Sequence, residues 1–337
     1  MKAYALTKKD SHGLEALELI EAPVPRPQAD EVLVKVESIG LNPVDYKLIK
    51  RPLPSFTYPH IFGLDAAGTV VAVGENVQGF KVGDRVSGHN DLHQNGTFAE
   101  YAIFPAYSLA KIPAEVSFKT AAALLCGAMT AYQALFRKLN LTGKKTILIH
   151  AGAGGVGSIA LQLAKLKHLE VLTTVSTAKK DFVKAFHPEK IIDYKQEDVT
   201  KAVLEYTNGQ GVDLIINTVG SKEAKLDLTE RLAYNGELVC LVEVPKVDDP
   251  AWLFENGLSL SALNLGGAHG STAPTQKADL GQMARELLEL AKTKQLDPNI
   301  TTVLPFEKLV VGLKKLYQHD SLGKIVVTMG NGNKPPK

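Results

Sequence analysis

Three glycines at a fixed spacing carry the clearest chemistry in the sequence. Gly152, Gly154 and Gly157 form G-x-G-x-x-G between the apolar run KTILIH and a segment with helical periodicity. Glycine permits a tight turn and removes the Cβ that would keep a pyrophosphate from the backbone, and a helix N-terminus presents N–H groups and a positive dipole end. The pattern predicts a dinucleotide-binding turn that also includes Gly155 and Val156. A glycine-rich turn without a ligand is the alternative.

The end of the next strand indicates which dinucleotide binds. NAD-binding proteins usually place an acid there, which holds the ribose 2′-hydroxyl. The stretch LTTVSTAKKD has no acid before Asp181 and instead offers hydroxyls and lysines, which can receive a 2′-phosphate. We therefore expect NADP(H), bound by Ser176, Thr177 and Lys180, with Tyr194 as a further phenol donor. The alternative is that the lysines only solvate a helix face.

The surrounding elements indicate how this turn is positioned. After about residue 120, strand-like apolar runs alternate with helices, one of which places Ile159 and Leu163 on the same face. This alternation predicts an α/β fold with a doubly wound parallel sheet, whereas the short strand-like runs before it are typical of a compact β domain. The end of the chain is too small to stand alone. We expect one domain from residues 1–122 and 266–337, and a second from residues 123–265.

Composition limits the classes of partner and the compartment. The chain has 337 residues, of which 45% are hydrophobic and 22% charged, and its net charge is +2 because 38 Lys and Arg oppose 36 Asp and Glu. Without a basic cluster or a long apolar run, we expect neither a nucleic-acid nor a membrane partner. Cys126 and Cys240 cannot form a disulfide framework, and the opening MKAYALTKKD lacks the apolar core of a signal peptide, so a cytoplasmic location is expected.

Several further motifs show a family resemblance. They are GLNPVDYK, GLDAAGTVVAVGENV, KVGDRV, GTFAEY, TAYQAL, AGAGGVG and GKIVV, and they extend over nearly the whole chain. The sequence resembles the medium-chain dehydrogenase/reductase superfamily, within it the zinc-independent quinone oxidoreductase (zeta-crystallin-like) branch, which includes alkenal and enone reductases. The resemblance implies a GroES-like β-rich catalytic domain, an inserted Rossmann domain and an active site in the cleft between them. It also implies cofactor contacts from Thr130 and Val219, and a homodimer joined near residues 258–267.

The resemblance also bears on zinc. Zinc alcohol dehydrogenases of this superfamily have a Cys, a His and a second Cys at the positions of Asn42, Leu64 and Cys126. An open catalytic zinc site needs three protein ligands, and only Cys126 is of a suitable type. We therefore expect no metal, and we interpret Cys126 as a packing residue.

The histidines are interpreted as follows. His89 and His93 have a spacing that suits metal ligands on a helix, but the Gly, Asn and Asp around them predict a polar surface loop. His150 ends a strand and is expected to be buried and satisfied near the cofactor. For His269, in LGGAHGS, we expect a position at the mouth of the cleft and assign no role.

Without zinc, other groups must stabilise the negative charge that develops on the substrate. Quinones and α,β-unsaturated aldehydes and ketones suit such a site, because hydride addition moves charge onto an oxygen that a few hydrogen-bond donors can stabilise. The catalytic candidates are Lys47, Tyr46 and Asn42. Some enone reductases that resemble this chain have a lysine at the Lys47 position, which favours enones over quinones. A surface salt bridge for Lys47 and a helix-cap role for Asn42 are the structural alternatives.

Two other functions stay open. The protein would be a reductase of 2-enoyl thioesters if its cleft admits a phosphorylated carrier. It would be a non-catalytic NADPH-binding protein, similar to a lens crystallin, if it binds NADPH tightly without turning over any acceptor.

Overall fold

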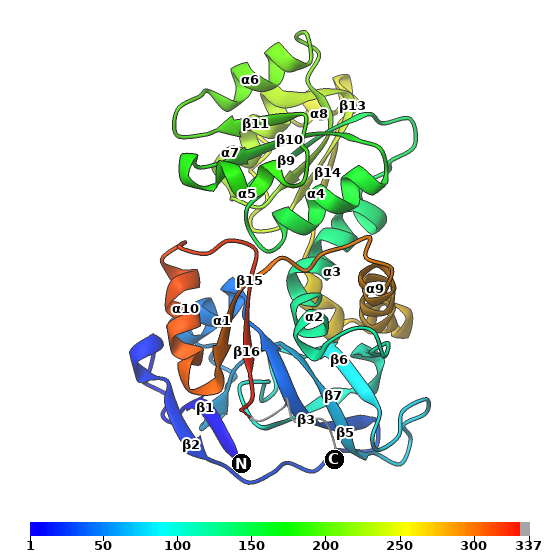
Figure 1. Ribbon diagram of the computed structural model, residues 1–337. Helices are drawn as coiled ribbons and strands as arrows, with labels where there is room; N and C mark the ends of the chain where they lie inside the picture. Colours follow the sequence, from blue (N-terminus) through cyan, green and yellow to red (C-terminus); the bar gives the residue numbers. More distant parts are fainter. Residues whose placement is uncertain (331–337) are drawn as a thin grey trace. The chain divides into compact units, whose positions relative to one another are not determined.

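The computed structural model describes residues 1–330, which form two compact units. Unit 1 contains residues 1–129 together with the described residues from 266 onward, and unit 2 contains residues 130–265 (Figure 1). Helix α3, Cys126–Gln133, crosses the division. Each unit has its own sheet and its own apolar core.

Unit 1 is built on strands. Its larger sheet has the order β15-β16-β3-β5-β6-β8, with β7 also paired to β3, and its smaller sheet has the order β2-β1-β4. Most pairings are antiparallel, and β15 pairs parallel with β16. The strands are β1 Lys2–Leu6, β2 Glu18–Glu21, β3 Glu31–Gly40, β4 His60–Ile61, β5 Asp65–Val73, β6 Arg85–His89, β7 Tyr101–Pro105, β8 Leu109–Lys111, β15 Ile300–Pro305 and β16 Lys324–Thr328. The pairing of β16 with β3 brings the end of the chain into the N-terminal sheet.

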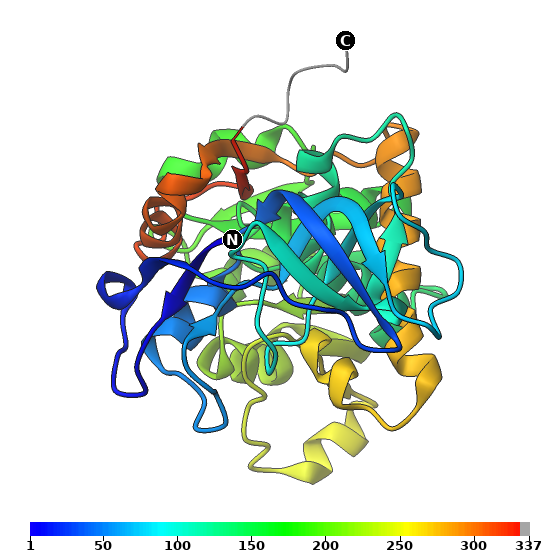
Figure 2. The ribbon, with the colours of Figure 1, turned by 90° about the horizontal axis from the view of Figure 1, so that it is seen from below.

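Helices cover the two ends of this larger sheet. They are α1 Pro43–Lys50, α2 Phe118–Ala123, α9 Pro274–Lys292 and α10 Leu309–Tyr317, with short turns η1 Leu14–Ala16, η2 Ala106–Ser108, η6 Leu265–Gly270 and η7 Phe306–Lys308. Figure 2 shows α9 and α10 on opposite sides of the blue and cyan strands, consistent with contacts of α9 to β6 and β8 and of α10 to β15 and β16. Helices α9 and α10, both from the C-terminal part of the chain, therefore pack against different strands of the same sheet.

Unit 2 contains the parallel sheet that the alternating pattern predicts. Its order is β11-β10-β9-β12-β13-β14, and every pairing is parallel. The strands are β9 Thr146–Ile149, β10 Glu170–Val175, β11 Lys190–Asp193, β12 Val212–Asn217, β13 Leu232–Cys240 and β14 Ser259–Ala262. Residues 147–149 of β9 are fully buried, as expected for a central strand with helices on both faces.

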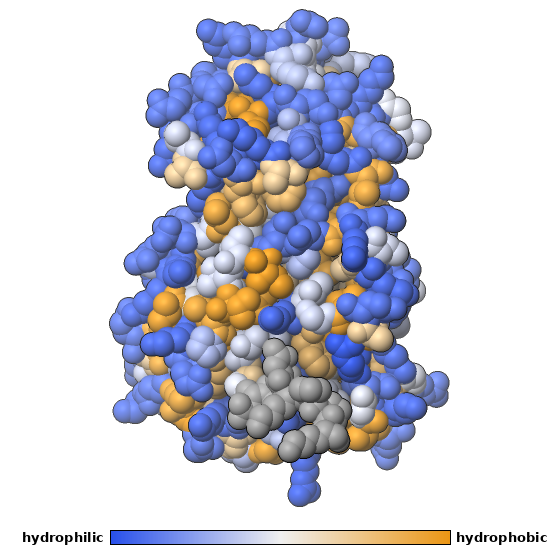
Figure 3. Space-filling model, in the orientation of Figure 1, coloured by the Kyte–Doolittle hydropathy of each residue, from blue (hydrophilic) through white to orange (hydrophobic). Residues whose placement is uncertain are grey.

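The helices of unit 2 are α4 Gly157–Leu166, α5 Lys180–Lys184, α6 Val199–Tyr206, α7 Ser221–Leu226 and α8 Pro250–Glu255, with η3 Ala134–Lys138, η4 Thr177–Lys179 and η5 Asp227–Arg231. Of these α-helices, α4, α5, α6 and α7 have buried residues, whereas α8 has none. On α4 the buried residues include Ile159 and Leu163, the face that the sequence predicts. Hydrophilic residues cover most of the visible face of unit 2 (Figure 3). The predicted α/β class with a doubly wound parallel sheet is confirmed.

Candidate functional site

The glycine turn lies at the carboxyl edge of the sheet of unit 2, between β9 and α4. A Cβ on Gly152 would lie 2.2 Å from Thr173 Oγ1, and one on Gly157 would lie 2.3 Å from the Ala151 carbonyl oxygen. A Cβ on Gly154 would meet only that same oxygen, at 3.4 Å. Two of the glycines are therefore needed for packing, whereas the third faces open space that a pyrophosphate can approach.

The neighbouring strand ends bring together the residues expected to bind a 2′-phosphate. Ser176 and Thr177 follow β10, and Tyr194 follows β11 with 53% of its surface exposed. Thr177 Oγ1 donates to Asp193 Oδ2 at 2.6 Å, and Lys180 Nζ lies 3.3 Å from the same oxygen. The hydroxyl of Thr177 is the main reason that the pKa of Asp193 is lowered. An acid therefore lies at this edge after all.

Asp193 was not predicted from the sequence, because it follows a different strand from β10, at whose end an acid is expected. Asp193 is the last residue of β11, which pairs parallel with β10, so both strands end at the same edge. It is fully buried and already bonded to Thr177 and Lys180. The parallel register was the signal available for finding it.

The end of β12 forms the other side of this edge. Asn217 Oδ1 accepts from the backbone N–H groups of Val219 and Gly220, at 3.1 and 3.0 Å. Thr218 Oγ1 donates to the carbonyl oxygen of His150, which follows β9. The loop of residues 218–220 is therefore tied to the start of the glycine turn. Thr130, also expected to contact the cofactor, is nearly buried in α3.

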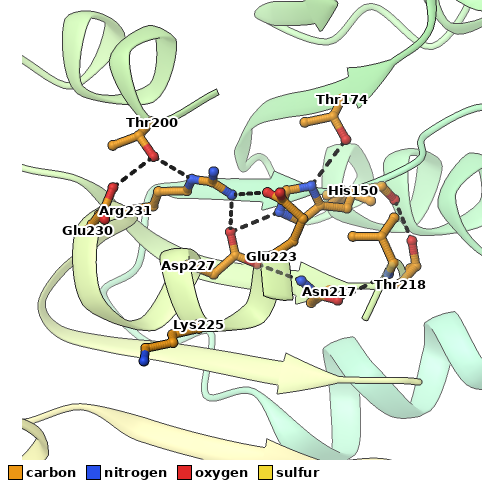
Figure 4. Close-up of polar contacts among 12 residues, drawn as sticks. His150, Thr174, Thr200, Asn217, Thr218, Glu223, Lys225, Asp227, Glu230 and Arg231 are labelled. Atoms are coloured by element: carbon orange, nitrogen blue, oxygen red, sulfur yellow. Dashed lines mark hydrogen bonds and ion pairs between the residues drawn. The ribbon is translucent and has the colours of Figure 1, made fainter. Parts of the chain in front are cut away.

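A buried polar network lies beneath this loop (Figure 4). His150 Nε2 lies 2.9 Å from Asp227 Oδ1, and its Nδ1 lies 3.1 Å from Thr174 Oγ1. Arg231 Nη1 donates to Asp227 Oδ1 at 2.8 Å, and Asn217 Nδ2 donates to Asp227 Oδ2 at 2.7 Å. The prediction that His150 is buried and satisfied is confirmed, although its main partner, Asp227, was not anticipated.

In unit 1, the three catalytic candidates lie at helix α1: Asn42 immediately precedes the helix, and Tyr46 and Lys47 are within it. The helix begins after Asn42 because Pro43 suits the first helical position and the Asp45 carboxylate accepts from the Asn42 N–H at 2.7 Å. The Tyr46 ring is 7% exposed and packs edge-on against Tyr317, with ring centroids 5.5 Å apart. The Tyr46 ring is therefore mainly buried in its contact with Tyr317.

Lys47 lies on the exposed side of α1. Within residues 1–330 its ammonium makes no hydrogen bond or ion pair, so the salt bridge considered as its structural alternative is not formed there. Of the three candidates at α1, Lys47 is the one whose polar group is both exposed and uncommitted.

The side chain of Asn42 is buried and fully engaged. Its Nδ2 donates to Asp65 Oδ2 at 2.7 Å and to the Gly40 carbonyl at 3.2 Å, and its Oδ1 accepts from Lys324 Nζ at 2.7 Å. Asp65 Oδ2 also accepts from the Cys126 N–H, at 2.9 Å. This arrangement supports the structural alternative for Asn42 more than a direct contact with substrate.

Asp65 and Lys324 were not singled out from the sequence. Both are buried, and Lys324 Nζ lies 3.9 Å from Asp65 Oδ2. Burial raises the pKa of Asp65 to about 6, while the charge of Lys324 and the amide of Asn42 oppose the increase. The residues occur in GLDAAG and GKIVV, about 260 positions apart, and no local pattern indicates that they meet.

One expectation for the histidines is wrong. His89 is the last residue of β6 and is 1% exposed, because β6 is paired with both β5 and β8 and is not part of a surface loop. Its Nδ1 lies 3.2 Å from His269 Nε2, and His269 Nδ1 lies 2.9 Å from Tyr107 Oη. His93 is exposed, as predicted. Asn90 and Asp91, which are typical of a loop, begin only after the strand ends, and Gly88 lies within the strand.

Comparisons with known proteins agree with this architecture. Residues 28–114 match the family described as Alcohol dehydrogenase GroES-like domain, and residues 187–327 match Zinc-binding dehydrogenase. The chloroplast envelope quinone oxidoreductase homolog of Arabidopsis thaliana is 36% identical over 241 residues, covering 69% of this chain and 72% of that protein. A quinone-oxidoreductase homolog of Spinacia oleracea, described as chloroplastic, is 40% identical over 213 residues. That match covers 61% of this chain and 64% of the spinach protein, less than two thirds of its length.

Solved structures extend the similarity to nearly the whole chain. Mycobacterial Rv1454c complexed with NADPH is 29% identical with a TM-score of 0.83, and CurK enoyl reductase is 25% identical with a TM-score of 0.82. Both comparisons cover 97% of this chain and 99% of the other. The fold and the glycine turn define a protein that combines a GroES-like unit with a Rossmann-type unit. The chain belongs to the medium-chain dehydrogenase/reductase superfamily, in its quinone oxidoreductase branch.

The residues at the zinc positions do not fit zinc, although one matching family is named for it. Leu64 is a buried hydrocarbon side chain, and the amide of Asn42 is already bonded to the Lys324 ammonium, whose charge would repel a metal cation. Nowhere in residues 1–330 do three or more His, Cys, Asp or Glu gather in a way that could hold a metal ion. In the same described part of the chain, no helix has the length and apolar character needed to cross a bilayer.

Two glycine-to-alanine variants test the assignment of the glycine turn as a dinucleotide-binding turn. Gly154→Ala should fold with nearly wild-type Tm, because Gly154 lacks positive φ and its added Cβ meets no close atom, but it should raise the Kd for NADPH about tenfold or more by filling the open side. Gly152→Ala should cost about 1–3 kcal/mol of stability, because its Cβ overlaps Thr173. Thermal unfolding and fluorescence titration would measure both. Unchanged NADPH affinity in Gly154→Ala would contradict the assignment of the turn.

The burial of His89 predicts that the free energy of unfolding depends on pH. Burial, with smaller contributions from His269 and Lys324, lowers the pKa of His89 to about 3. In the unfolded chain a histidine takes up a proton near pH 6.5, so the stability that neutral His89 contributes is present above pH 6.5 and is lost as pH falls toward 3.

Relative to His89→Gln, which does not titrate in this range, the wild type should lose up to about 1.4 kcal/mol of unfolding free energy per pH unit between roughly pH 6 and pH 4. Urea unfolding of both proteins at several pH values tests this. Taking the difference cancels the contributions of other titrating groups that the two proteins share. Two stability curves that stay parallel over this interval would show that His89 is not held neutral.

Proposed function

We propose that this protein is an NADPH-dependent reductase of quinones or α,β-unsaturated aldehydes and ketones that works without a metal. The observation that carries the proposal is the buried arrangement of Asn42, Asp65 and Lys324, in which the amide of Asn42, one of the three residues that the resemblance places at zinc-ligand positions, is bonded to a carboxylate and an ammonium. Oxidation of a simple alcohol normally needs a group such as zinc to deprotonate it. An acceptor that is already activated needs only donors for the oxygen on which charge develops.

The cofactor assignment rests on the glycine turn and on the ends of β10 and β11, which lie at the same edge of the sheet. Gly154 leaves room for a pyrophosphate, and Ser176, Lys180 and the exposed Tyr194 supply donors for a 2′-phosphate. Because the carboxylate of Asp193 is buried and bonded to Thr177 and Lys180, it is less able to accept from a ribose 2′-hydroxyl. NADPH, when bound, supplies the hydride. The NADPH complex of a structural neighbour is consistent with this assignment.

We assign the stabilisation of the substrate oxygen to Lys47. When hydride reaches the β-carbon of an enone, charge builds on the carbonyl oxygen, and an ammonium stabilises that enolate more than the ground-state ketone. Lys47 fits because its ammonium is exposed and makes no contact within residues 1–330, whereas the amide of Asn42 is engaged and the ring of Tyr46 packs against Tyr317. Tyr46 and Asn42 then position α1.

Two alternatives have some support. The similarity to CurK enoyl reductase favours a 2-enoyl thioester as acceptor. A non-catalytic NADPH-binding role needs the same glycine turn but no acceptor.

We further propose a homodimer through β14, the edge strand of the sheet of unit 2. The cytoplasmic location stays a prediction, because two relatives are described as chloroplast proteins.

The reaction is tested by NADPH oxidation with matched quinones, enones, 2-enoyl thioesters and saturated aldehydes, after dialysis against a chelator. Quinones or enones should be reduced, saturated aldehydes should not, and NADPH should bind at least about tenfold more tightly than NADH, since one charge-assisted contact to the phosphate is worth about 1.5 kcal/mol. Turnover of thioesters alone would favour the first alternative. Tight NADPH binding without turnover would favour the second, and activity that depends on added zinc would refute the proposal.

Lys47→Met tests the catalytic assignment. It keeps an unbranched side chain but removes the ammonium, so kcat/KM for enones should fall by roughly 10², with NADPH affinity unchanged and quinones less affected. Lys50→Met is the matched control, because Lys50 lies on the same helix and its ammonium instead bonds the Tyr317 hydroxyl at 2.7 Å. Wild-type enone reduction by Lys47→Met, or a loss confined to NADPH binding, would show that the role is wrong.

A further inference from the structure

The buried carboxylate of Asp227 uses both of its oxygens. Oδ1 receives His150 Nε2 at 2.9 Å and Arg231 Nη1 at 2.8 Å, and Oδ2 receives Asn217 Nδ2 at 2.7 Å (Figure 4). Burial by itself raises the pKa of Asp227, but His150, Asn217 and Arg231 together lower it below the usual value. The group is therefore ionised at neutral pH and can only accept hydrogen bonds.

This acceptor determines which way the amide of Asn217 faces. A carboxamide has a donor side and an acceptor side, and beside an ionised carboxylate the donor side must face Asp227. The acceptor side then faces the loop, where Asn217 Oδ1 receives the N–H groups of Val219 and Gly220. Gly220 has a φ of 127°, a conformation that other residues rarely adopt, so the loop depends on specific hydrogen bonds.

The loop of residues 218–220 lies where a bound dinucleotide would continue. It follows β12, which pairs parallel with β9, and Thr218 Oγ1 bonds the carbonyl of His150 at the start of the glycine turn. In an open α/β sheet the ligand lies outside the carboxyl ends of the strands, with the pyrophosphate on the glycine turn and the adenosine ribose near the end of the next strand. With the adenosine toward β10, the nicotinamide end extends toward β12.

We propose that Asp227 is a positioning residue for cofactor binding, which acts through Asn217 by holding residues 218–220 in the conformation that receives the nicotinamide end of NADPH. The inference rests on the proposed function, because it takes NADPH to bind at this edge. The inference goes beyond the proposed function by assigning a role to a carboxylate that lies beneath the site and does not touch the cofactor.

The variant Asn217→Asp separates this role from general stabilisation. It keeps the shape of the side chain and the acceptor for Val219 and Gly220, but it faces Asp227 with a second carboxylate. Above neutral pH the two charges repel and the hydrogen bond is lost, whereas at lower pH one shared proton restores it.

The other groups around Asp227 come from four elements. They are His150, after β9; Arg231, on η5; Glu223, on α7, which is bonded to Arg231; and Cys240, on β13. Burial, and then the charge of Asp227, raises the pKa of the Cys240 thiol to about 11, so this thiol stays neutral below pH 9.

The double variant Asn217→Asp/Asp227→Asn reverses the hydrogen bond. Asn at position 227 would donate to Asp at position 217, while its own Oδ1 accepts from His150 and Arg231. One negative charge is kept, and every polar group has a partner. Rescue by this exchange is not expected if either residue matters only for its size.

The experiment measures the Kd for NADPH by fluorescence titration from pH 5.5 to pH 8.5 for the wild type, both single variants and the double variant, together with their Tm. Asn217→Asp should bind NADPH about tenfold or more weakly at pH 8.5, because the hydrogen bond to the charged carboxylate of Asp227 is lost, and should approach the wild type at pH 5.5. The double variant should bind within about threefold of the wild type at both pH values.

Hydrogen exchange of the Val219 and Gly220 amides without cofactor gives a second readout. In Asp227→Asn the amide of Asn217 is no longer forced to face one way, so exchange at these two amides should accelerate by about tenfold or more, while the central strand β9 stays protected. This measurement applies even where a variant is too unstable for titration at high pH.

Wild-type affinity in Asn217→Asp at pH 8.5, no rescue by the double variant, or unchanged exchange in Asp227→Asn would each overturn the inference. A wild-type protein that binds NADPH but reduces no acceptor would refute the proposed reaction and leave this inference standing. A wild-type protein that binds no NADPH would refute both.

Discussion

An ionised carboxylate can be buried only if hydrogen bonds and opposite charge replace the water that it loses, because the uncompensated cost is several kcal/mol or more. Asp65 and Asp227, both with no exposed surface, impose this condition on the two units. In unit 1, Asp65 meets it with the amide of Asn42, the N–H of Cys126 and the charge of Lys324. These partners precede α1, begin α3 and begin β16, so one carboxylate fixes three separate segments.

In unit 2, Asp227 meets the same condition with side chains from the carboxyl ends of β9 and β12 and from its own helical turn. Those strand ends form the edge where the glycine turn leaves space beside Gly154. The edge at which we propose that NADPH binds is thus supported from below by the buried charge of Asp227. Both oxygens of this carboxylate accept hydrogen bonds from these side chains.

The network in unit 1 also limits the chemistry of the site. The amide of Asn42 is already bonded to the carboxylate of Asp65 and to the ammonium of Lys324, whose charge would repel a metal cation. Stabilisation of a developing oxyanion then falls to groups outside the network. The proposed function, with an activated acceptor and Lys47 as the exposed donor, follows from this limit.

The sequence by itself determined the parallel sheet, the face of α4 that is buried and the glycine turn, because hydrophobic period and the steric demands of glycine are local properties of the chain. It did not reveal Asp193 beside Lys180, Lys324 beside Asn42 or Asp227 beneath Asn217, and it placed His89 on the surface. Each of these depends on strand register or on contacts between residues far apart in sequence. Only the tertiary structure decided them, because a side chain becomes a partner when folding brings it within about 3 Å, and no local pattern specifies that distance.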